Sequence, residues 1–324
     1  MKQWGWMIFL LGSTGLVWGQ GAVRPLPAGY GQVWKDYDIS RYVDRLPVSS
    51  RAEASVMDWI LMETGFEVWH SVAPSMLYSS PKTIHVYHTP AVQQRVEALL
   101  ARFTNNDPWN HQFRVQVFTV PSPLWRQESL CRMQPIPSTA PGSQAWVIRP
   151  EEMAAVTRTF QETKDFTMHT AEVRTVPNGQ ALVLNFVRRR SYTRNYYTRP
   201  GKGGPEADDV ALDEGFSLEF MPLLTLDRGL VDAQIKFQIN HVDRFFPMTI
   251  EANGPKKIEI PMLGQYRFRD RYRWNPENAL LVSFGLTPYP VATGGETLPP
   301  LRVFNPTQRV ETFVLIEYRH KGDF

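Results

Sequence analysis

The last two thirds of the chain constrain its fold most, because short apolar runs with strand character follow one another from about residue 110. These runs cover residues 113–117, 181–187, 216–220, 231–240, 280–284 and 313–318. Clusters of Pro, Gly, Asn and Thr separate them, as is typical of turns between strands. One stretch, residues 151–160, has helical spacing instead, with Met153, Val156 and Phe160 on one side. The pattern predicts a mainly β domain over residues 111–324, interrupted by one helix.

The preceding segment, residues 37–106, mixes helix and strand signals. Ser50 and Glu53 have the spacing of a capping box, in which the two side chains satisfy each other's exposed backbone amides. Thr89 and Pro90 fit the cap and the first residue of a second helix. Residues 82–88, between the two helices, have strand character. We therefore expect a small helix–strand module over residues 37–106, separate from the β domain.

The N-terminal residues 1–19 have the pattern of a secretory signal peptide. Lys2 gives the positive start, residues 6–11 are apolar, and Gly19 ends a plausible cleavage site. A single membrane anchor is the alternative, but the apolar run is shorter than the roughly 20 residues that a spanning helix needs. We expect an exported protein whose Pro/Gly-rich leader, residues 20–36, precedes the module.

Composition excludes several classes of function. The net charge of +3 over 324 residues is too small for a dedicated nucleic-acid binder. Cys131 is the only cysteine, so neither an internal disulfide nor a thiolate zinc cage can form. His85 and His88 lie three apart on an expected strand, where they point to opposite faces and cannot share a metal. We find no nucleophile elbow or phosphate loop, and we expect no enzyme activity, no catalytic residue, no cofactor and no metal site.

Residues 266–274 form the most regular alternating stretch. As a strand, they place Arg267, Arg269, Arg271 and Arg273 on one face and aromatic residues on the other, with Asp270 among the aromatics. In a barrel, the arginines would face a wet lumen and the aromatics would lie near a membrane–water boundary. In a sandwich, the aromatics would enter the core and the arginines would be solvated. Alternation alone does not separate these two interpretations.

A second basic and aromatic tract lies at residues 188–199. Such residues could contact phosphates and stack on bases, but export and the small net charge disfavour a nucleic-acid partner. An acidic group follows closely in the sequence. Its members are Glu206, Asp208, Asp209, Asp213 and Glu214. We therefore expect a long hairpin whose arginines pair with acidic residues of the same chain or of a neighbour.

Several short motifs carry a family resemblance. Residues 83–86 (Thr-Ile-His-Val), the following Thr89-Pro90 and residues 96–100 (Val-Glu-Ala-Leu-Leu) resemble the ring-building module of the bacterial secretins. The β domain is similar to the secretin core through a second set of residues, which are Pro177, Gly179, Gly215, Pro222 and Asp227. The gate segment of the family is rich in Pro-Leu-Gly and is matched poorly by residues 298–301, Leu-Pro-Pro-Leu.

The resemblance implies an α+β fold with a ring-building-type module followed by a larger, mainly β secretin-like domain. It also implies a homo-oligomeric ring or pore for protein secretion, of the type II or type III kind, in the periplasm or outer membrane. The partners would be copies of the chain itself and other envelope secretion components. A second hypothesis is an exported, non-enzymatic structural or surface protein that reuses the secretin core without spanning a membrane. A third is a secreted hydrolase.

Overall fold

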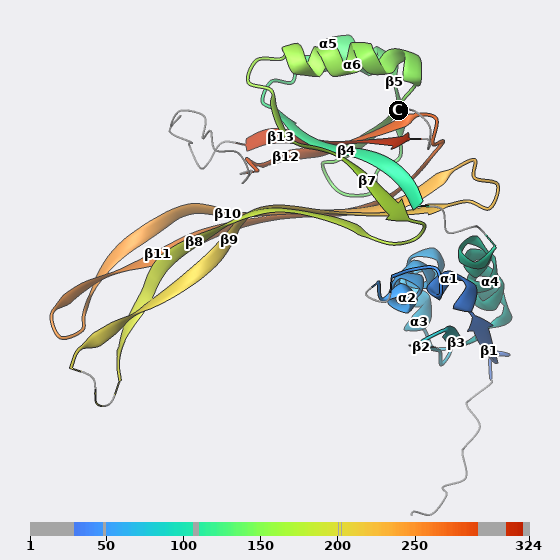
Figure 1. Ribbon diagram of the computed structural model, residues 1–324, viewed down its shortest axis with the longest axis horizontal. Coiled ribbons are helices and arrows are strands. Elements are labelled where there is room, and N and C mark those ends of the chain that lie inside the picture. Colours follow the sequence, from blue (N-terminus) through green and yellow to red (C-terminus); the bar gives the residue numbers. More distant parts are fainter. Residues whose placement is uncertain are drawn as a thin grey trace, which may run out of the picture.

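The computed structural model describes residues 29–47, 50–105, 110–199, 201, 203–290 and 309–319, and its fold is α+β with mostly strands, as the sequence predicts. Its strands form three antiparallel sheets. Figure 1 shows a helix layer, a six-stranded sheet, a four-stranded sheet and the small module following one another across the molecule. The expected signal peptide and the gate segment lie outside the described residues.

The small module places two long helices on one face of a three-stranded sheet. Its elements are β1 (Val33–Asp38), α1 (Ser40–Val43), α2 (Ala52–Thr64), α3 (Phe66–Trp69), β2 (Met76–Ser80), β3 (Thr83–His88) and α4 (Pro90–Thr104). The sheet order is β1-β3-β2. Because β1 begins at Val33 and pairs along β3, the folded module starts within the segment expected to be a leader.

The expected capping box does not form. Helix α2 begins at Ala52 with Arg51 as its N-cap, and no side chain caps it. The amide of Ser50 donates to the carbonyl of Pro47 in the preceding turn, so Ser50 belongs to the turn and not to the helix terminus. The second expected helix, α4, does begin at Pro90 after Thr89.

The six-stranded sheet carries two helices on its outer face. Its order is β5-β6-β12-β13-β4-β7. The elements are β4 (Asn110–Val120), α5 (Trp125–Ser129), the 3-10 helix η1 (Leu130–Arg132), β5 (Met133–Ile136), β6 (Gln144–Ile148), α6 (Pro150–Glu162), β7 (Thr167–Pro177), β12 (Ala279–Pro288) and β13 (Arg309–Arg319). Trp125 on α5 and Phe160 on α6 pack against Phe118 and Phe313 of the sheet. The sequence predicts α6 but not the short α5.

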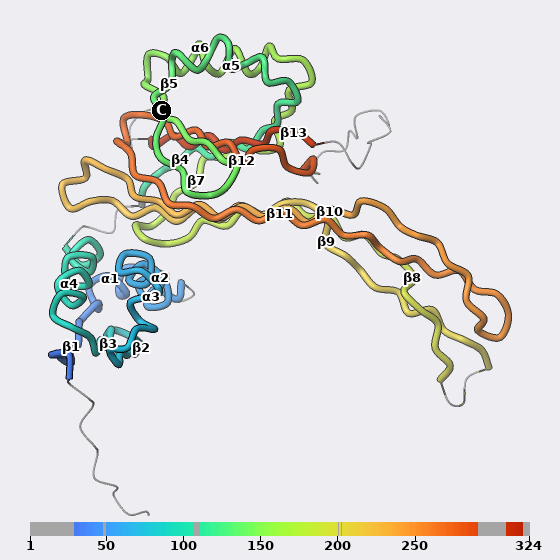
Figure 2. Tube along the Cα trace, turned by 180° about the vertical axis from the view of Figure 1, so that it is seen from behind, coloured from blue at the N-terminus to red at the C-terminus, as the bar shows by residue number. Residues whose placement is uncertain are grey.

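The four-stranded sheet is built from two hairpins that continue beyond the body of the protein. Its strands are β8 (Leu182–Thr198), β9 (Pro205–Leu224), β10 (Val231–Glu251) and β11 (Pro255–Trp274), in the order β11-β10-β9-β8. β9 and β10 pair only from Leu224↔Val231 to Gly215↔Asn240, after which the hairpins diverge (Figures 1 and 2). At Gly215 φ is +144°, and a Cβ would lie 2.1 Å from the carbonyl oxygen of Phe186, so this position requires glycine.

The sandwich interpretation of residues 266–274 agrees with the packing of the aromatic face. Phe268, Tyr272 and Trp274 are buried in the core between the two large sheets. Asp270 lies on the same face and is satisfied by the Ser138 hydroxyl at 2.8 Å and by the Thr139 amide and hydroxyl at 2.6 and 2.7 Å. Within the described ranges, no helix has the length and apolar character needed to cross a membrane.

The second basic tract forms the expected hairpin, and its arginines pair within the chain. Arg188 contacts Glu214 at 2.7 Å, Arg194 contacts Asp208 at 2.8 Å, and Arg199 contacts Glu206 at 3.3 Å. Only the Glu214 carboxylate is buried among these acids, and the amide of Val242 also donates to it. The paired β8–β9 hairpin therefore neutralises most of its own charge.

Two histidines should make the fold sensitive to acid. Burial lowers the pKa of His111 and of His169 from 6.5 to about 4, and the charge of Arg228 adds to the effect at His111. Well above pH 6.5, at about pH 7.5, both side chains are mostly neutral in the folded and in the unfolded state. As the pH falls from 6.5 towards 4, the unfolded chain binds protons that the folded chain cannot. Stability should therefore fall by about 2 kcal/mol per histidine at pH 5.

Urea unfolding at pH 7.5 and pH 5 measures this loss. The variant His111→Gln should lose less stability between these pH values than the unmodified protein. The variant His70→Gln, at an exposed histidine of the module, is the matched control and should behave like the unmodified protein. An equal loss in all three proteins would contradict the assignment.

Candidate functional site

The turn between β7 and β8 is where the module docks on the β domain. Residues 177–180, Pro-Asn-Gly-Gln, contain two of the motif positions expected from the sequence, Pro177 and Gly179. The Tyr42 hydroxyl of α1 donates to the Asn178 carbonyl at 2.8 Å, and the Trp59 indole of α2 donates to the Gly179 carbonyl at 3.2 Å. The motif therefore serves as the contact point between two parts of the same chain.

Gly179 is fixed by both conformation and packing. Its φ is +77°, and a Cβ on it would lie 2.3 Å from Cε1 of Phe103 in α4. Its amide donates to the carbonyl of Pro222, another motif residue, at 2.6 Å. Phe103 in turn meets the Tyr42 ring edge to face, with centroids 4.9 Å apart. Because Gly179 leaves room for Phe103, the helices approach the sheet closely.

A cluster of charged side chains continues the junction across the four-stranded sheet. Asp232 on β10 is fully buried and accepts hydrogen bonds from Arg271 at 2.7 Å and from Arg273 at 2.9 Å, both on β11. Arg102 reaches the same carboxylate from α4 at 3.3 Å, and Arg271 also donates to Glu63 of α2 at 2.6 Å. Three cations and two carboxylates thus link the module to the β domain.

The protonation of Asp232 is set by two opposing effects. Burial would raise its pKa, but hydrogen bonds from Arg271 and Arg273 and the charges of Arg271 and Arg102 outweigh burial and hold the pKa below its ordinary value. Arg102 has further partners because it donates to the carbonyls of Leu223 and Leu224 at 2.7 and 3.0 Å. Arg102 is thereby held in place beside Asp232, and the carboxylate stays ionised near neutral pH.

The arginine stripe has two parts with different surroundings. Arg271 and Arg273 belong to the junction, whereas Arg267 and Arg269 line a shallow cavity of about 360 Å³ on the same face of the sheet. Lys236 and Glu219 line this cavity too and pair at 2.6 Å. A lumen-facing role of the stripe stays a prediction, and it concerns mainly Arg267 and Arg269.

The remaining motif residues lie apart from the junction. Gly215 marks the divergence of the hairpins. Asp227 lies in the turn between β9 and β10, where it accepts hydrogen bonds from the Thr225 hydroxyl and the Gly229 amide, and these bonds lower its pKa. The sequence reasoning missed Glu63, Arg102 and Asp232 as partners of the stripe. The sequence does place Asp232 at the start of the polar face of residues 231–240, whose other face is apolar, and this position could have pointed to a charged partner.

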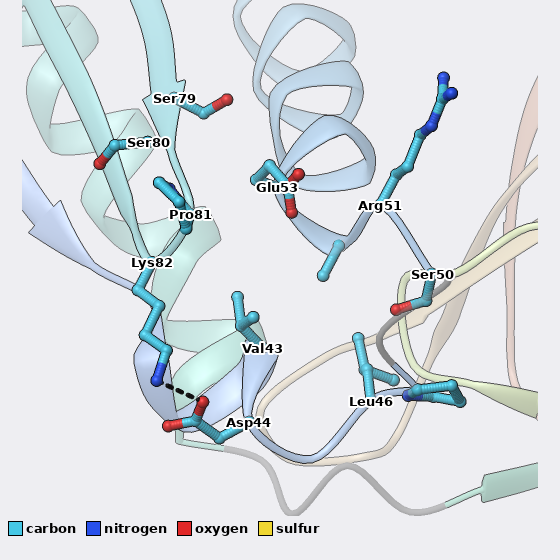
Figure 3. Close-up of a pocket in the computed structure, with 12 residues that line it drawn as sticks. Val43, Asp44, Leu46, Ser50, Arg51, Glu53, Ser79, Ser80, Pro81 and Lys82 are labelled. Atoms are coloured by element: carbon cyan, nitrogen blue, oxygen red, sulfur yellow. Dashed lines mark ion pairs between the residues drawn. The ribbon is translucent and has the colours of Figure 1, made fainter.

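A larger cavity, of about 560 Å³, lies in the module between α1, the start of α2 and the β2–β3 turn (Figure 3). Its edge carries an exposed ion pair, Lys82 to Asp44 at 2.7 Å, and its wall includes Val43, Leu46 and Pro81. In the described part of the chain, no three His, Cys, Asp or Glu side chains come together in a way that could hold a metal ion.

Comparisons with known proteins concern the fold. No family model and no curated protein matches the sequence. Among solved structures, the chain is similar to the secretin domain β-barrel of InvG from the Salmonella SPI-1 injectisome, with 10% identity, a TM-score of 0.25, and coverage of 89% of this chain and 87% of that chain. For the type IV competence pilus secretin PilQ of V. cholerae, the identity is 10% and the TM-score is 0.26, with coverage of 89% of this chain and 77% of that chain. For the type II secretin GspD of enteropathogenic Escherichia coli, the identity is 8% and the TM-score is 0.28, with coverage of 89% of this chain and 88% of that chain.

The variant Asp232→Asn should destabilise the junction. It removes the buried negative charge that three arginines share, and the loss of one partner from a buried pair typically costs about 3–5 kcal/mol. Urea unfolding measures the stability, and limited proteolysis between residues 105 and 110 measures detachment of the module. Asp213→Asn is the matched control, since Asp213 is exposed and lies 3.9 Å from Arg189, so the expected cost is below about 0.5 kcal/mol. Equal effects of the two substitutions would argue against the junction as the main electrostatic contact.

Proposed function

We propose that this chain is a non-enzymatic, secretin-like subunit that assembles with copies of itself into a ring in the bacterial cell envelope, for the passage of proteins. The observation that supports it most is the pair of long outer strands of the four-stranded sheet. β8 and β11 span 17 and 20 residues, and each pairs with only one strand in the described part of the chain. A long outer strand that pairs with one neighbouring strand favours pairing with another chain.

The strand directions favour closure of such a sheet. The four strands alternate in direction, so β11 of one copy would run antiparallel to β8 of the next. Repeated around a ring, this pairing would join four strands from each copy into one closed barrel without free edges. The module, held at the junction, would form a second ring beside the barrel.

The projecting β10–β11 hairpin carries exposed apolar side chains that an assembly would bury. Phe246 on β10 pairs with Ile260 on β11, and Met248 and Met262 lie on the same face two residues further along their strands. Each of the four side chains is between 41 and 50% exposed. A contiguous apolar face of this kind is typical of a surface covered by protein or lipid. In the proposed ring, a neighbouring copy or the membrane would cover it.

The exported structural protein remains the second candidate. One observation favours it: the aromatic side of β11 enters the core of a sandwich and does not lie on the outside of a barrel. In that case, the six-stranded sheet would cover the four-stranded sheet permanently, and no pore would be needed.

Electron microscopy of the full chain, extracted in mild detergent, tests the proposal. We expect closed rings. The double variant Arg267→Gln, Arg269→Gln should keep the rings and reduce the anion preference of channels in planar bilayers, because it removes cations from the lumen side without touching Asp232. Arg158→Gln, on the exposed side of α6, should change neither property. Monomers without conductance would overturn the ring and leave the structural protein.

A serine probe tests the non-enzymatic part of the proposal. Ser80 Oγ lies 3.1 Å from His85 Nε2, and His85 Nδ1 lies 2.7 Å from Asp36 Oδ1, which is the order of a hydrolase triad. These groups lie on a sheet face where the Asp36 side chain is 54% exposed, so water screens any oxyanion formed there. With a fluorophosphonate and mass spectrometry, we expect no more adduct on Ser80 than on Ser79. An adduct on Ser80 that disappears in His85→Ala would support the hydrolase hypothesis instead.

A further inference from the structure

The outer face of the small sheet lies opposite the helices of the module and is partly exposed, although Tyr87 on its central strand is only 5% exposed. Its helices lie between the sheet and the β domain, so the opposite face points away from the rest of the molecule (Figures 1 and 2). Strand alternation and register place nine residues on this face: Trp34, Asp36, Asp38, Met76, Tyr78, Ser80, Thr83, His85 and Tyr87. On the two outer strands of this sheet, Trp34 is 39% exposed and Tyr78 is 47% exposed, so both aromatic rings are accessible to a ligand.

The rings on this face touch one another in a continuous patch, which we call the aromatic face (Trp34, Tyr78, His85 and Tyr87). Tyr78 and His85 are stacked, with centroids 4.4 Å apart and planes 18° apart. Trp34 lies 5.8 Å from Tyr78 and 6.0 Å from Tyr87, although its strand and that of Tyr78 are separated by β3. The patch therefore bridges all three strands, a width of about 10 Å.

A chain of hydrogen bonds holds the Trp34 and His85 rings in place, and Tyr78 stacks on His85. The Trp34 indole donates to Asp36 Oδ1 at 2.8 Å, and this same oxygen is 2.7 Å from His85 Nδ1. His85 Nε2 continues the chain to the Ser80 hydroxyl at 3.1 Å. Because the rings are ordered before any ligand arrives, binding would cost little side-chain entropy.

The charge of this face restricts the chemistry of its partner. Asp36 and Asp38 are the carboxylates among its nine residues, and none of the nine is Lys or Arg. Nucleic acids and anionic lipids would be repelled, since both need cations at the contact. A sugar ring offers a C–H face that stacks on aromatic rings and an edge of hydroxyl groups that can bond to Asp36 and the Tyr78 hydroxyl. A single cationic side chain would cover only part of a patch this wide.

We propose that the aromatic face binds a neutral polysaccharide chain, which lies across β1, β3 and β2. The patch is broad and lies on a sheet surface, so an extended polymer fits it better than a small enclosed ligand. This inference is independent of the ring, because the face belongs to one module and points away from the β domain.

Isothermal titration calorimetry of the full chain with cellohexaose and chitohexaose tests the proposal. We expect binding of at least one of them, weakened about tenfold or more by Trp34→Ala and by Tyr78→Ala. Phe66→Ala is the matched control, since Phe66 belongs to the same module, is 63% exposed and lies on α3. It should leave binding unchanged. Circular dichroism checks that each variant is folded, as expected for exposed positions.

Other results of these experiments would show that the aromatic face binds a partner other than a polysaccharide. Asp36→Asn keeps hydrogen-bonding atoms and removes the charge, so it should leave oligosaccharide binding within about threefold. Binding of hexalysine in place of both sugars, lost in Asp36→Asn, would show that the face takes cations and would overturn the proposal. Loss of self-association in Trp34→Ala without sugar binding would show that a second copy covers it. No binding of either oligosaccharide to the unmodified protein would also overturn it.

Discussion

A buried carboxylate, Asp232, is the constraint on which the arrangement of the two parts depends. It lies on a strand of the β domain, yet one of the three cations that balance it, Arg102, comes from the module. A charge removed from water requires partners with fixed geometry, because an unpaired one costs several kcal/mol. Separation of the module from the sheet would therefore remove Arg102 from this carboxylate and leave it with the two arginines of β11. Tyr42, Trp59 and Phe103 add a neutral contact around Gly179.

This junction determines which surfaces stay available. It includes Arg271 and Arg273 as partners of Asp232, so Arg267 and Arg269 are the two arginines of the stripe that lie outside the junction. It also places the helices of the module against the β domain, which leaves the opposite face of the small sheet uncovered. The projecting hairpins lie at the far side of the four-stranded sheet and take no part in the junction. The junction thus leaves two surfaces on opposite sides of the molecule: the projecting hairpins, which suit the proposed assembly, and the outer face of the small sheet, which suits the proposed ligand.

Local patterns in the sequence predict most of the elements but not how they meet. Alternation identifies the strands and the two faces of residues 231–240 and 266–274, since side-chain period depends on the backbone alone. The helix α4 follows from Thr89 and Pro90 in the same way. Alternation does not reveal that Asp232 lies opposite Arg273 or that Arg102 reaches the same carboxylate, because these contacts join residues 41 and 130 positions apart. The capping box failed because a turn at Pro47 competes for Ser50.

The rigid junction has a consequence for the proposed ring. If the module were tethered loosely, contacts between neighbouring modules would form independently of contacts between neighbouring β domains. With the module fixed by Asp232 and Gly179, the proposed pairing of β8 with β11 would place each module at a set position beside the next. The second contact then forms within an existing complex, at a high effective concentration, and each weak contact strengthens the other. Weakening the junction should consequently lower ring stability even though Asp232 lies on neither outer strand of the sheet.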